Sequence, residues 1–246
     1  MTLVEILLSK GEVDLRDKIK NKQYFEEYIA QQENRILKFS DKLQKGEVRE
    51  DRIFPVKKKI YDLKFSIFEA KYSKGEDLEI LKEEFSKIVF NMPQYWNHVS
   101  GYTEILWMLS IAVMFEIDRK EWEILTDLII KNNMDDWLLG YLLSSREKDC
   151  PYCHWKFKME NPYGYLKNII SHSRTQGNDL KDYLENKWYI AHNEMAWYEI
   201  HNNNEKLYSG YWSYESGAVA KILNIDDSML RDVKYYPYDL VHYKIH

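Results

Sequence analysis

Apolar side chains that recur every three or four residues constrain the fold of this chain more than any other feature. The cleanest stretch repeats at steps of 3-4-3-4-3, through Ile53, Val56, Ile60, Leu63, Ile67 and Ala70. This spacing places the apolar side chains on one face of an α-helix, whereas a strand would require a period of two. Similar stripes occupy residues 25–43 and 78–88. We therefore expect three helices, packed as antiparallel neighbours because the turns between them are short.

Capping residues predict where these helices begin and end. We expect Asp14 to cap the first helix, and Gly46 and Gly75 to follow the ends of the first and second. Further along, Asp118 with Glu121 three positions later has the pattern of a capping box. Asp135 and Asp226 are expected to begin helices, Pro162 to open another, and residues 180–198 and 212–223 to form helices by their apolar spacing. Residues 146–161 are expected to form an irregular connection.

The segment 91–117 contains no Lys or Arg, and the part from 105 to 115 is almost entirely apolar. A helix that is apolar on most sides belongs in a protein interior, so we predict a central buried helix over 103–117. The chain has few turn formers, with 9 Gly and 5 Pro in 246 residues. The sequence therefore predicts an all-α fold, a compact bundle of roughly ten helices. We expect two modules, 1–117 and 118–246, packed as one unit.

The charge balance excludes some classes of protein. The chain has 35 Lys and Arg against 40 Asp and Glu, a net charge of −5, whereas a dedicated nucleic-acid binder has a basic surface. The apolar stretch 105–115 is about half the ~20 residues that a membrane-spanning helix needs. The chain start also lacks the basic and apolar pattern of an export signal. We expect a cytoplasmic protein that binds neither membrane nor nucleic acid directly.

The strongest short motif is Cys150-Pro-Tyr-Cys153-His154. It matches a glutaredoxin-type redox pair and the attachment pattern of c-type haem, but it lies within a helical chain and no export signal precedes it. A zinc site needs four ligands, and only His154 or His172 is available to complete the cysteine pair. No nucleophile elbow, phosphate-binding loop, dinucleotide fingerprint or HExxH motif is present. We expect no enzyme, metal or cofactor, and a thiol- or metal-dependent enzyme centred on Cys150 and Cys153 is the alternative.

Glu215 lies in an apolar stripe, one helical turn after Trp212 and one turn before Val219. A carboxylate in such a position is costly unless it is paired or hydrogen-bonded. We interpret Glu215 as a buried polar anchor, held by a Tyr hydroxyl or a Lys, with catalysis as the alternative. Its replacement by Gln is expected to reduce stability.

Aromatic motifs mark the C-terminal part of the chain. They are Trp188-Tyr-Ile-Ala-His192, Trp197-Tyr198, the run from Tyr208-Ser-Gly-Tyr211 to Leu223, and Tyr235-Tyr-Pro-Tyr-Asp-Leu240. With Leu15-Arg-Asp-Lys18, Tyr24-Phe-Glu-Glu-Tyr-Ile29 and Tyr72-Ser-Lys-Gly75, these motifs resemble the PoNi immunity proteins, antidotes to polymorphic nuclease (PoNe) DNase toxins. The positions expected to hold the fold are Trp188, Trp197, Tyr211, Trp212, Glu215, Tyr236, Pro237 and Asp239.

The resemblance implies a non-enzymatic, cytoplasmic immunity protein that binds and neutralises a cognate bacterial DNase toxin in interbacterial competition. A DNase presents a basic surface to DNA, and an acidic surface can compete for it. Residues 118–246 carry most of the negative charge, a net −4 against −1 for residues 1–117. A structural adaptor unrelated to toxins is a further alternative. The predicted toxin-binding residues are exposed acids of the C-terminal half: Asp135, Asp136, Glu147, Asp149, Asp179, Asp182 and Glu185.

Overall fold

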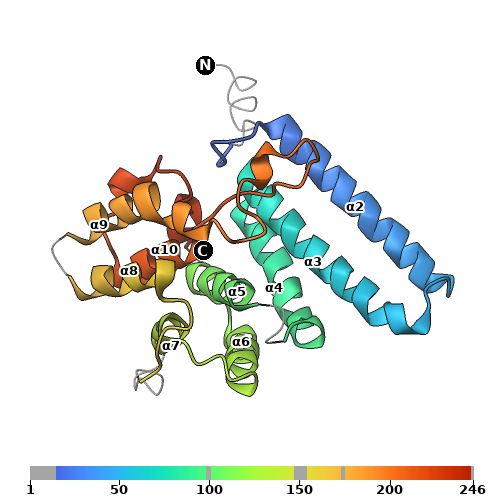
Figure 1. The fold of residues 1–246 in the computed structure, drawn as a ribbon, viewed down its shortest axis with the longest axis horizontal. Helices are drawn as coiled ribbons and strands as arrows, with labels where there is room; N and C mark the ends of the chain where they lie inside the picture. Colours follow the sequence, from blue (N-terminus) through green and yellow to red (C-terminus); the bar gives the residue numbers. More distant parts are fainter. Residues whose placement is uncertain (1–14, 98–100, 147–153, 173–174, 245–246) are drawn as a thin grey trace, which may run out of the picture. The chain divides into compact units, whose positions relative to one another are not determined.

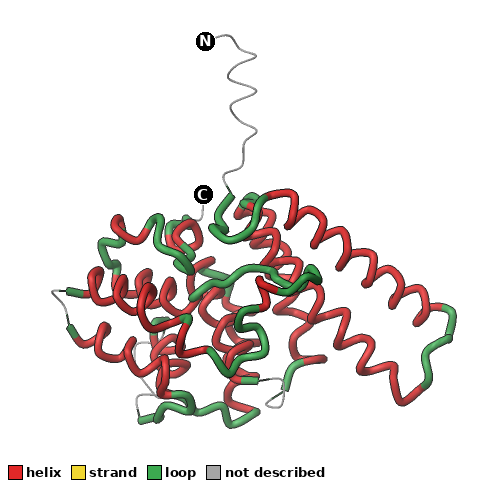
Figure 2. Tube along the Cα trace, turned by 45° about the horizontal axis from the view of Figure 1, so that its top comes forward, coloured by secondary structure: helices red, strands yellow, loops and turns green. Residues whose placement is uncertain are grey.

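The computed structural model describes residues 15–97, 101–146, 154–172 and 175–244. Within these residues the structure has ten α-helices and no strand, which confirms the all-α prediction (Figure 2). Contacts between Cα atoms divide the chain into two compact units. The first unit comprises the chain up to Ile88 together with the later segment Glu199–Gly210. The second unit comprises Val89–Tyr198 and the chain from Tyr211 onwards.

The first unit is built on an antiparallel pair of long helices, α2 (Lys22–Gln44) and α3 (Glu50–Lys74), with the first part of α4 (Leu78–Tyr95) (Figure 1). The predicted stripes supply its core. Buried side chains from the three helices are Phe25, Tyr28, Ile29, Leu63, Ile67, Ala70, Leu81, Phe85 and Ile88. The three helices expected from the spacing are therefore present.

The first helix begins later than the sequence predicted. Asn21, not Asp14, is its N-cap, and the Asn21 side chain accepts a hydrogen bond from Tyr24 N at 2.9 Å. Asp14 itself lies outside the described residues. The preceding turn is not helical because the Asp17 carboxylate accepts from the amides of Ile19 and Lys20, a local pattern that competes with helix formation. Gly75, with φ of 100°, ends α3 as predicted.

The second unit forms around α5 (Tyr102–Phe115), which packs against α6 (Arg119–Lys131), α7 (Trp137–Ser144), α10 (Tyr214–Leu223) and α11 (Tyr238–Val241). The side chains from Ile105 to Phe115 are buried except for Trp107, which is partly exposed. The prediction of a central buried helix is confirmed for this unit. The helix ends at Glu116, whose left-handed backbone (φ of 50°) turns the chain toward α6.

Two further capping predictions are confirmed, and one was wrong by one residue. The Asp118 carboxylate accepts from Glu121 N at 2.9 Å, and the Glu121 carboxylate accepts from Asp118 N at 3.0 Å, which confirms the capping box. Asp136, not Asp135, caps α7, and it accepts from the amides of the two following leucines. Asp226 opens the short 3₁₀ turn Ser228–Leu230 as expected, because its carboxylate accepts from Ser228 N at 3.3 Å.

The segment between α8 and α10 departs furthest from prediction. α8 (Glu160–Ser171) becomes regular after a kink at Asn161, so Pro162 opens it as expected. α9 (Gln176–Tyr183) continues into a π-helical turn, Leu184–Trp188, and a 3₁₀ turn, Ile190–His192. The single helix predicted over 180–198 is therefore wrong beyond residue 192. His192 Nδ1 bonds Trp188 O at 2.6 Å, and the aromatic packing that follows turns the chain.

Candidate functional site

A buried carboxylate, Glu215, lies near the start of α10 in the second unit. Its side chain is 0% exposed, and its Oε1 accepts from Trp188 Nε1 at 2.6 Å and from Ser213 Oγ at 2.7 Å. Glu215 Oε2 has no hydrogen-bond partner among the described residues. Burial raises the pKa of Glu215 to about 7, against the opposing effect of the hydrogen bond from Ser213. The expected buried anchor is present, but an indole and a serine hydroxyl hold it instead of a Tyr or a Lys.

Buried polar groups extend from Trp188 to the start of α7. His192 Nδ1 donates to Trp188 O at 2.6 Å, because a carbonyl oxygen only accepts, and neutral Nε2 then accepts from Tyr163 OH at 3.0 Å. Burial lowers the pKa of His192 to about 4, so the ring is neutral at physiological pH. The ring centroids of Tyr163 and Tyr102 lie 5.7 Å apart, and Tyr102 OH donates to Asp136 Oδ1 at 2.8 Å. These groups satisfy one another inside the protein.

Aromatic rings pack around this polar core. Trp188 and Trp197 stack with centroids 5.7 Å apart, and Tyr235 lies 5.0 Å from Trp188. Tyr211 lies 5.3 Å from Trp197 and donates from its hydroxyl to the Trp197 carbonyl at 3.0 Å. Rings in such offset and tilted arrangements stabilise a core beyond the area they bury. The motif residues Trp188, Trp197 and Tyr211 therefore hold the turns that follow α9.

The remaining motif positions are Trp212, Tyr236, Pro237 and Asp239. Trp212 and Pro237 are buried, and Asp239 is exposed. Tyr236 is 2% exposed and donates to Asp227 Oδ2 at 2.6 Å, while Asp227 Oδ1 lies 2.9 Å from His242 Nε2. Seven of the eight motif positions are thus buried or partly buried, as residues that hold a fold should be. Because Glu215, Trp188 and His192 are all 1% exposed or less, a substrate has no access to this carboxylate.

A second polar cluster, in the first unit, joins motifs that are far apart in the sequence. Tyr208 OH donates to the buried Asp17 Oδ2 at 2.5 Å, and Tyr208 N donates to Tyr24 OH at 3.0 Å. Ser73 Oγ donates to Ser209 O at 2.8 Å. The segment Glu199–Gly210 is therefore anchored to the N-terminal residues and to α3. These contacts join the quoted N-terminal motifs to the start of the C-terminal motif that begins at Tyr208.

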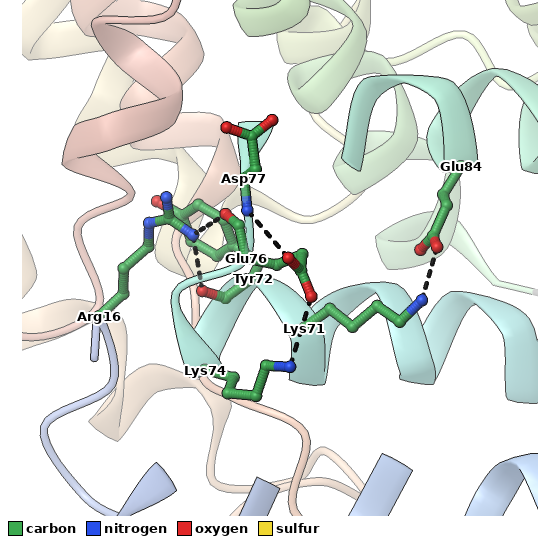
Figure 3. Close-up of polar contacts among 7 residues, drawn as sticks. All are labelled: Arg16, Lys71, Tyr72, Lys74, Glu76, Asp77 and Glu84. Carbon is green, nitrogen blue, oxygen red and sulfur yellow. Dashed lines mark hydrogen bonds and ion pairs between the residues drawn. The ribbon is translucent and has the colours of Figure 1, made fainter. Parts of the chain in front are cut away.

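The C-terminal end of α3 carries its own polar network (Figure 3). The Arg16 guanidinium donates to Tyr72 O at 3.1 Å and Glu76 O at 2.8 Å, and it lies 4.8 Å from the centroid of the Tyr72 ring. Lys71 Nζ pairs with Glu84 of α4 at 2.5 Å. A cation at a helix C-terminus is favoured by the unsatisfied carbonyl groups there. The Lys71–Glu84 pair joins α3 to α4, and we interpret the network as structural.

The predicted toxin-binding acids differ in exposure. Asp135, Asp182 and Glu185 are exposed, and Asp179 is half-buried. Asp136 is 0% exposed, so its prediction as a surface residue was wrong. The cause is its capping role, since its carboxylate accepts from Leu138 N, Leu139 N, Tyr102 OH and Lys158 N.

Several residues singled out in the sequence are not described by the structure. Glu147, Asp149, Cys150 and Cys153 lie outside the described residues. Where the structure describes side chains, no group of three or more His, Cys, Asp or Glu is placed to hold a metal ion. In the same part of the chain, no helix is both long enough and apolar enough to cross a membrane.

Sequence reasoning missed a surface hollow of about 470 Å³ between α8 and α9. Asp179 and Asp182 line it, together with Tyr165 from α8 and Lys187 from the π-helical turn. No local motif indicates Tyr165 or Lys187, because the two residues meet only through the packing of α8 on α9. The hollow is the surface feature that brings predicted binding residues together.

Comparisons with known proteins agree with this arrangement of motifs. A solved structure titled "The Crystal Structure of Protein PA2201 from Pseudomonas aeruginosa" has a similar fold, with a TM-score of 0.60 at 13% identity, covering 98% of this chain and 94% of that chain. No curated protein matches the chain. The family model for the N-terminal part of PoNe immunity proteins (PoNi) matches residues 16–127, and the model for their C-terminal part matches residues 134–240. With both parts matched in order over most of its length, the chain belongs to the family of PoNe immunity proteins.

Proposed function

We propose that this protein binds a PoNe-type DNase toxin and neutralises it by covering the surface that the toxin presents to DNA. The observation that carries the proposal is the match of both PoNi family models, in order, along the chain. The proposed inhibitor acts by stoichiometric binding and needs no catalytic group of its own. The proposed compartment is the cytoplasm, because the DNA that such a toxin attacks is there.

Electrostatics supports an acidic docking surface on the C-terminal half. A DNase must bind phosphate through basic side chains, and an acidic protein surface attracts those side chains and accelerates encounter. Asp135, Asp182 and Glu185 are exposed. Asp182 and Glu185 lie in ion pairs with Lys187 and Lys181 at the surface, and such pairs contribute little to stability and can be exchanged for pairs with a partner. Asp179 is half-buried and lies on α9 with Asp182. Asp136 is excluded by its burial, and Glu147 and Asp149 stay in the proposal on the basis of sequence.

The direct test is inhibition of a PoNe nuclease in vitro. Purified toxin is titrated with this protein while the cleavage of plasmid DNA is followed, and the mixture is analysed by size-exclusion chromatography. We expect one stable complex and loss of nuclease activity at a fixed molar ratio. Nuclease activity that persists at excess inhibitor, with no complex on the column, would contradict the proposal.

Charge reversal tests the surface. The triple variant Asp135→Lys, Asp182→Lys and Glu185→Lys should weaken toxin binding by about 10- to 100-fold, and flatten its dependence on salt, because exposed charge pairs each contribute modestly. The matched control reverses three exposed acids of the first unit, Glu26, Glu33 and Glu83. Equal affinity for the two triple variants would remove the assignment to the C-terminal half, while inhibition by the unmodified protein would still support neutralisation.

A further inference from the structure

The hollow between α8 and α9 already contains a positively charged group from the protein itself. Lys187 Nζ lies 3.3 Å from Asp182 Oδ2 and 5.2 Å from the centroid of the Tyr165 ring. The ammonium group is thus held between a carboxylate and the face of an aromatic ring, the two groups that best attract a cation at a surface. The walls of this hollow are therefore suited to a cation.

The hollow has more negative charge than Lys187 neutralises. Asp179 and Asp182 are three residues apart on α9, so their carboxylates lie on neighbouring positions of one helical face, and both line the hollow. Asp179 Oδ2 accepts from Thr175 Oγ1 at 2.6 Å, and Asp182 Oδ1 accepts from Asn186 Nδ2 at 2.9 Å. These neutral partners orient the carboxylates without neutralising them. Of the Asp, Glu, Lys and Arg side chains that line the hollow beside His172, two are carboxylates and one is an ammonium, which leaves a formal charge of −1 from these groups.

Exposure makes the site accessible to another protein. Tyr165 is 44% exposed, which is high for an aromatic residue, and the Asp182 side chain is 55% exposed. The inner wall is firm, because Tyr183 lines the hollow and is 1% exposed. Rigid walls with an exposed tyrosine are typical of positions that contribute strongly to protein binding.

We propose that this hollow receives an arginine side chain from the basic face of the PoNe-type toxin, and that Lys187 occupies the place of that arginine in the free protein. The inference rests on the proposed function. A guanidinium is planar, stacks on an aromatic ring and donates to two carboxylates at once, whereas the lysine ammonium is a point charge on a flexible chain. Lys187 can leave readily, because a half-exposed ion pair of this kind contributes little to stability.

The proposal predicts opposite effects for changes to the competitor and to the walls. Lys187→Met removes the competing cation and should tighten toxin binding about 3- to 10-fold. Asp182→Asn and Tyr165→Leu remove a wall and should each weaken binding about 10-fold or more. The gain from Lys187→Met should disappear in the double variant with Tyr165→Leu. The affinities are measured by titration calorimetry with the full toxin, and the melting temperature of each variant verifies that it is folded.

Arg119→Met is the matched control. Arg119 pairs with Glu123 at 2.7 Å on α6 and lines a different hollow, so its replacement removes one positive charge from the same unit. If Lys187→Met tightens binding no more than Arg119→Met does, the effect is one of net charge and the arginine site is wrong. Unchanged binding of Tyr165→Leu would also overturn it.

Measurements on the unmodified protein distinguish a failure of the proposed function from a failure of the arginine site. If it neither binds nor inhibits the toxin, the proposed function fails and the arginine site fails with it. If it inhibits the toxin while every hollow variant binds like the unmodified protein, the proposed function stands and the arginine site alone is wrong.

Discussion

Replacing Glu215 with glutamine removes a buried ionisable proton while it leaves the volume of the side chain almost unchanged. Glu215 is 0% exposed, and burial raises its pKa from 4.5 to about 7. A difference of about 2.5 pKa units corresponds to a stability difference of about 3 kcal/mol between the protonated and ionised forms. This contribution to stability should depend strongly on pH.

The direction of this pH dependence follows from the order in which the unfolded and the folded protein lose the Glu215 proton. Below pH 4.5, Glu215 is protonated in both the folded and the unfolded protein, and its favourable contribution is fully present. Between pH 4.5 and 7 the unfolded state loses its proton first, so rising pH favours unfolding. Above pH 7 the folded protein contains an ionised buried carboxylate, and about 3 kcal/mol of stability has been lost.

Glutamine does not titrate, so the difference between the two proteins isolates this group. Its Oε1 can still accept from Trp188 and Ser213, but its Nε2 replaces Oε2, for which the described residues offer no partner. The protonated carboxyl already places one unsatisfied O–H at this position, whereas the amide places two N–H donors there, and the extra unsatisfied donor costs about 1 kcal/mol. We expect Glu215→Gln to be less stable than the unmodified protein by about 1 kcal/mol at pH 4.5 and more stable by about 2 kcal/mol at pH 8. The sequence predicted that Glu215→Gln reduces stability, and the structure leads us to expect that loss only at acidic pH.

The measurement is urea denaturation at several pH values, followed by far-ultraviolet circular dichroism so that Trp188 does not dominate the signal. The control is Glu123→Gln, because the Glu123 side chain is 59% exposed and its ion pair with Arg119 lies at the surface. The control should change stability by less than ~0.5 kcal/mol at every pH. A stability difference for Glu215→Gln that stays constant from pH 4.5 to 8 would refute the reasoning.

Two further substitutions, one in each unit, test the packing within that unit. Tyr208→Phe removes the hydroxyl that donates to the buried Asp17 carboxylate and should cost about 1 to 3 kcal/mol of stability in urea denaturation. The control Tyr198→Phe, at a half-buried ring, should change stability by less than ~0.5 kcal/mol, and equal effects of the two substitutions would contradict the role given to Tyr208. Gly217→Ala places a Cβ 2.6 Å from Met114 Sδ and from the rigid ring of Pro237, and should lower stability by about 1 to 3 kcal/mol despite the better helix propensity of alanine. Gly164→Ala meets only the flexible Glu160 side chain within 4 Å and should be neutral or stabilising, so a Gly217→Ala protein as stable as this control would show that α10 is less tightly packed than described.

The short-range features of the fold could be predicted because their causes lie within a few residues of each other. The stripe from Ile53 to Ala70 forms one face of α3, and the Asp118 and Glu121 pair forms the capping box of α6. Both depend on the fixed geometry of a helical turn. The burial of Glu215 was predictable for the same reason, because its position between Trp212 and Val219 on one helix face is a property of local spacing.

The sequence could not distinguish neighbouring residues with identical chemistry. Asp135 and Asp136 are both acidic and adjacent, and only the packing of Tyr102 and Lys158 against Asp136 decides that this one is buried. The hydrogen bond from Tyr208 to Asp17 joins residues 191 positions apart, and no pattern of local spacing indicates it.

The sequence by itself determined that this chain is helical, which of its segments are the most apolar, and to which family it belongs, since periodicity, capping and motif order are properties of the chain before it folds. The tertiary structure decided which carboxylates reach the surface, which residues hold Glu215, and that Tyr165, Asp182 and Lys187 line one hollow. The physical reason is that a side chain's exposure and partners depend on elements brought together across long stretches of chain, whereas its place on a helix depends on the few residues beside it.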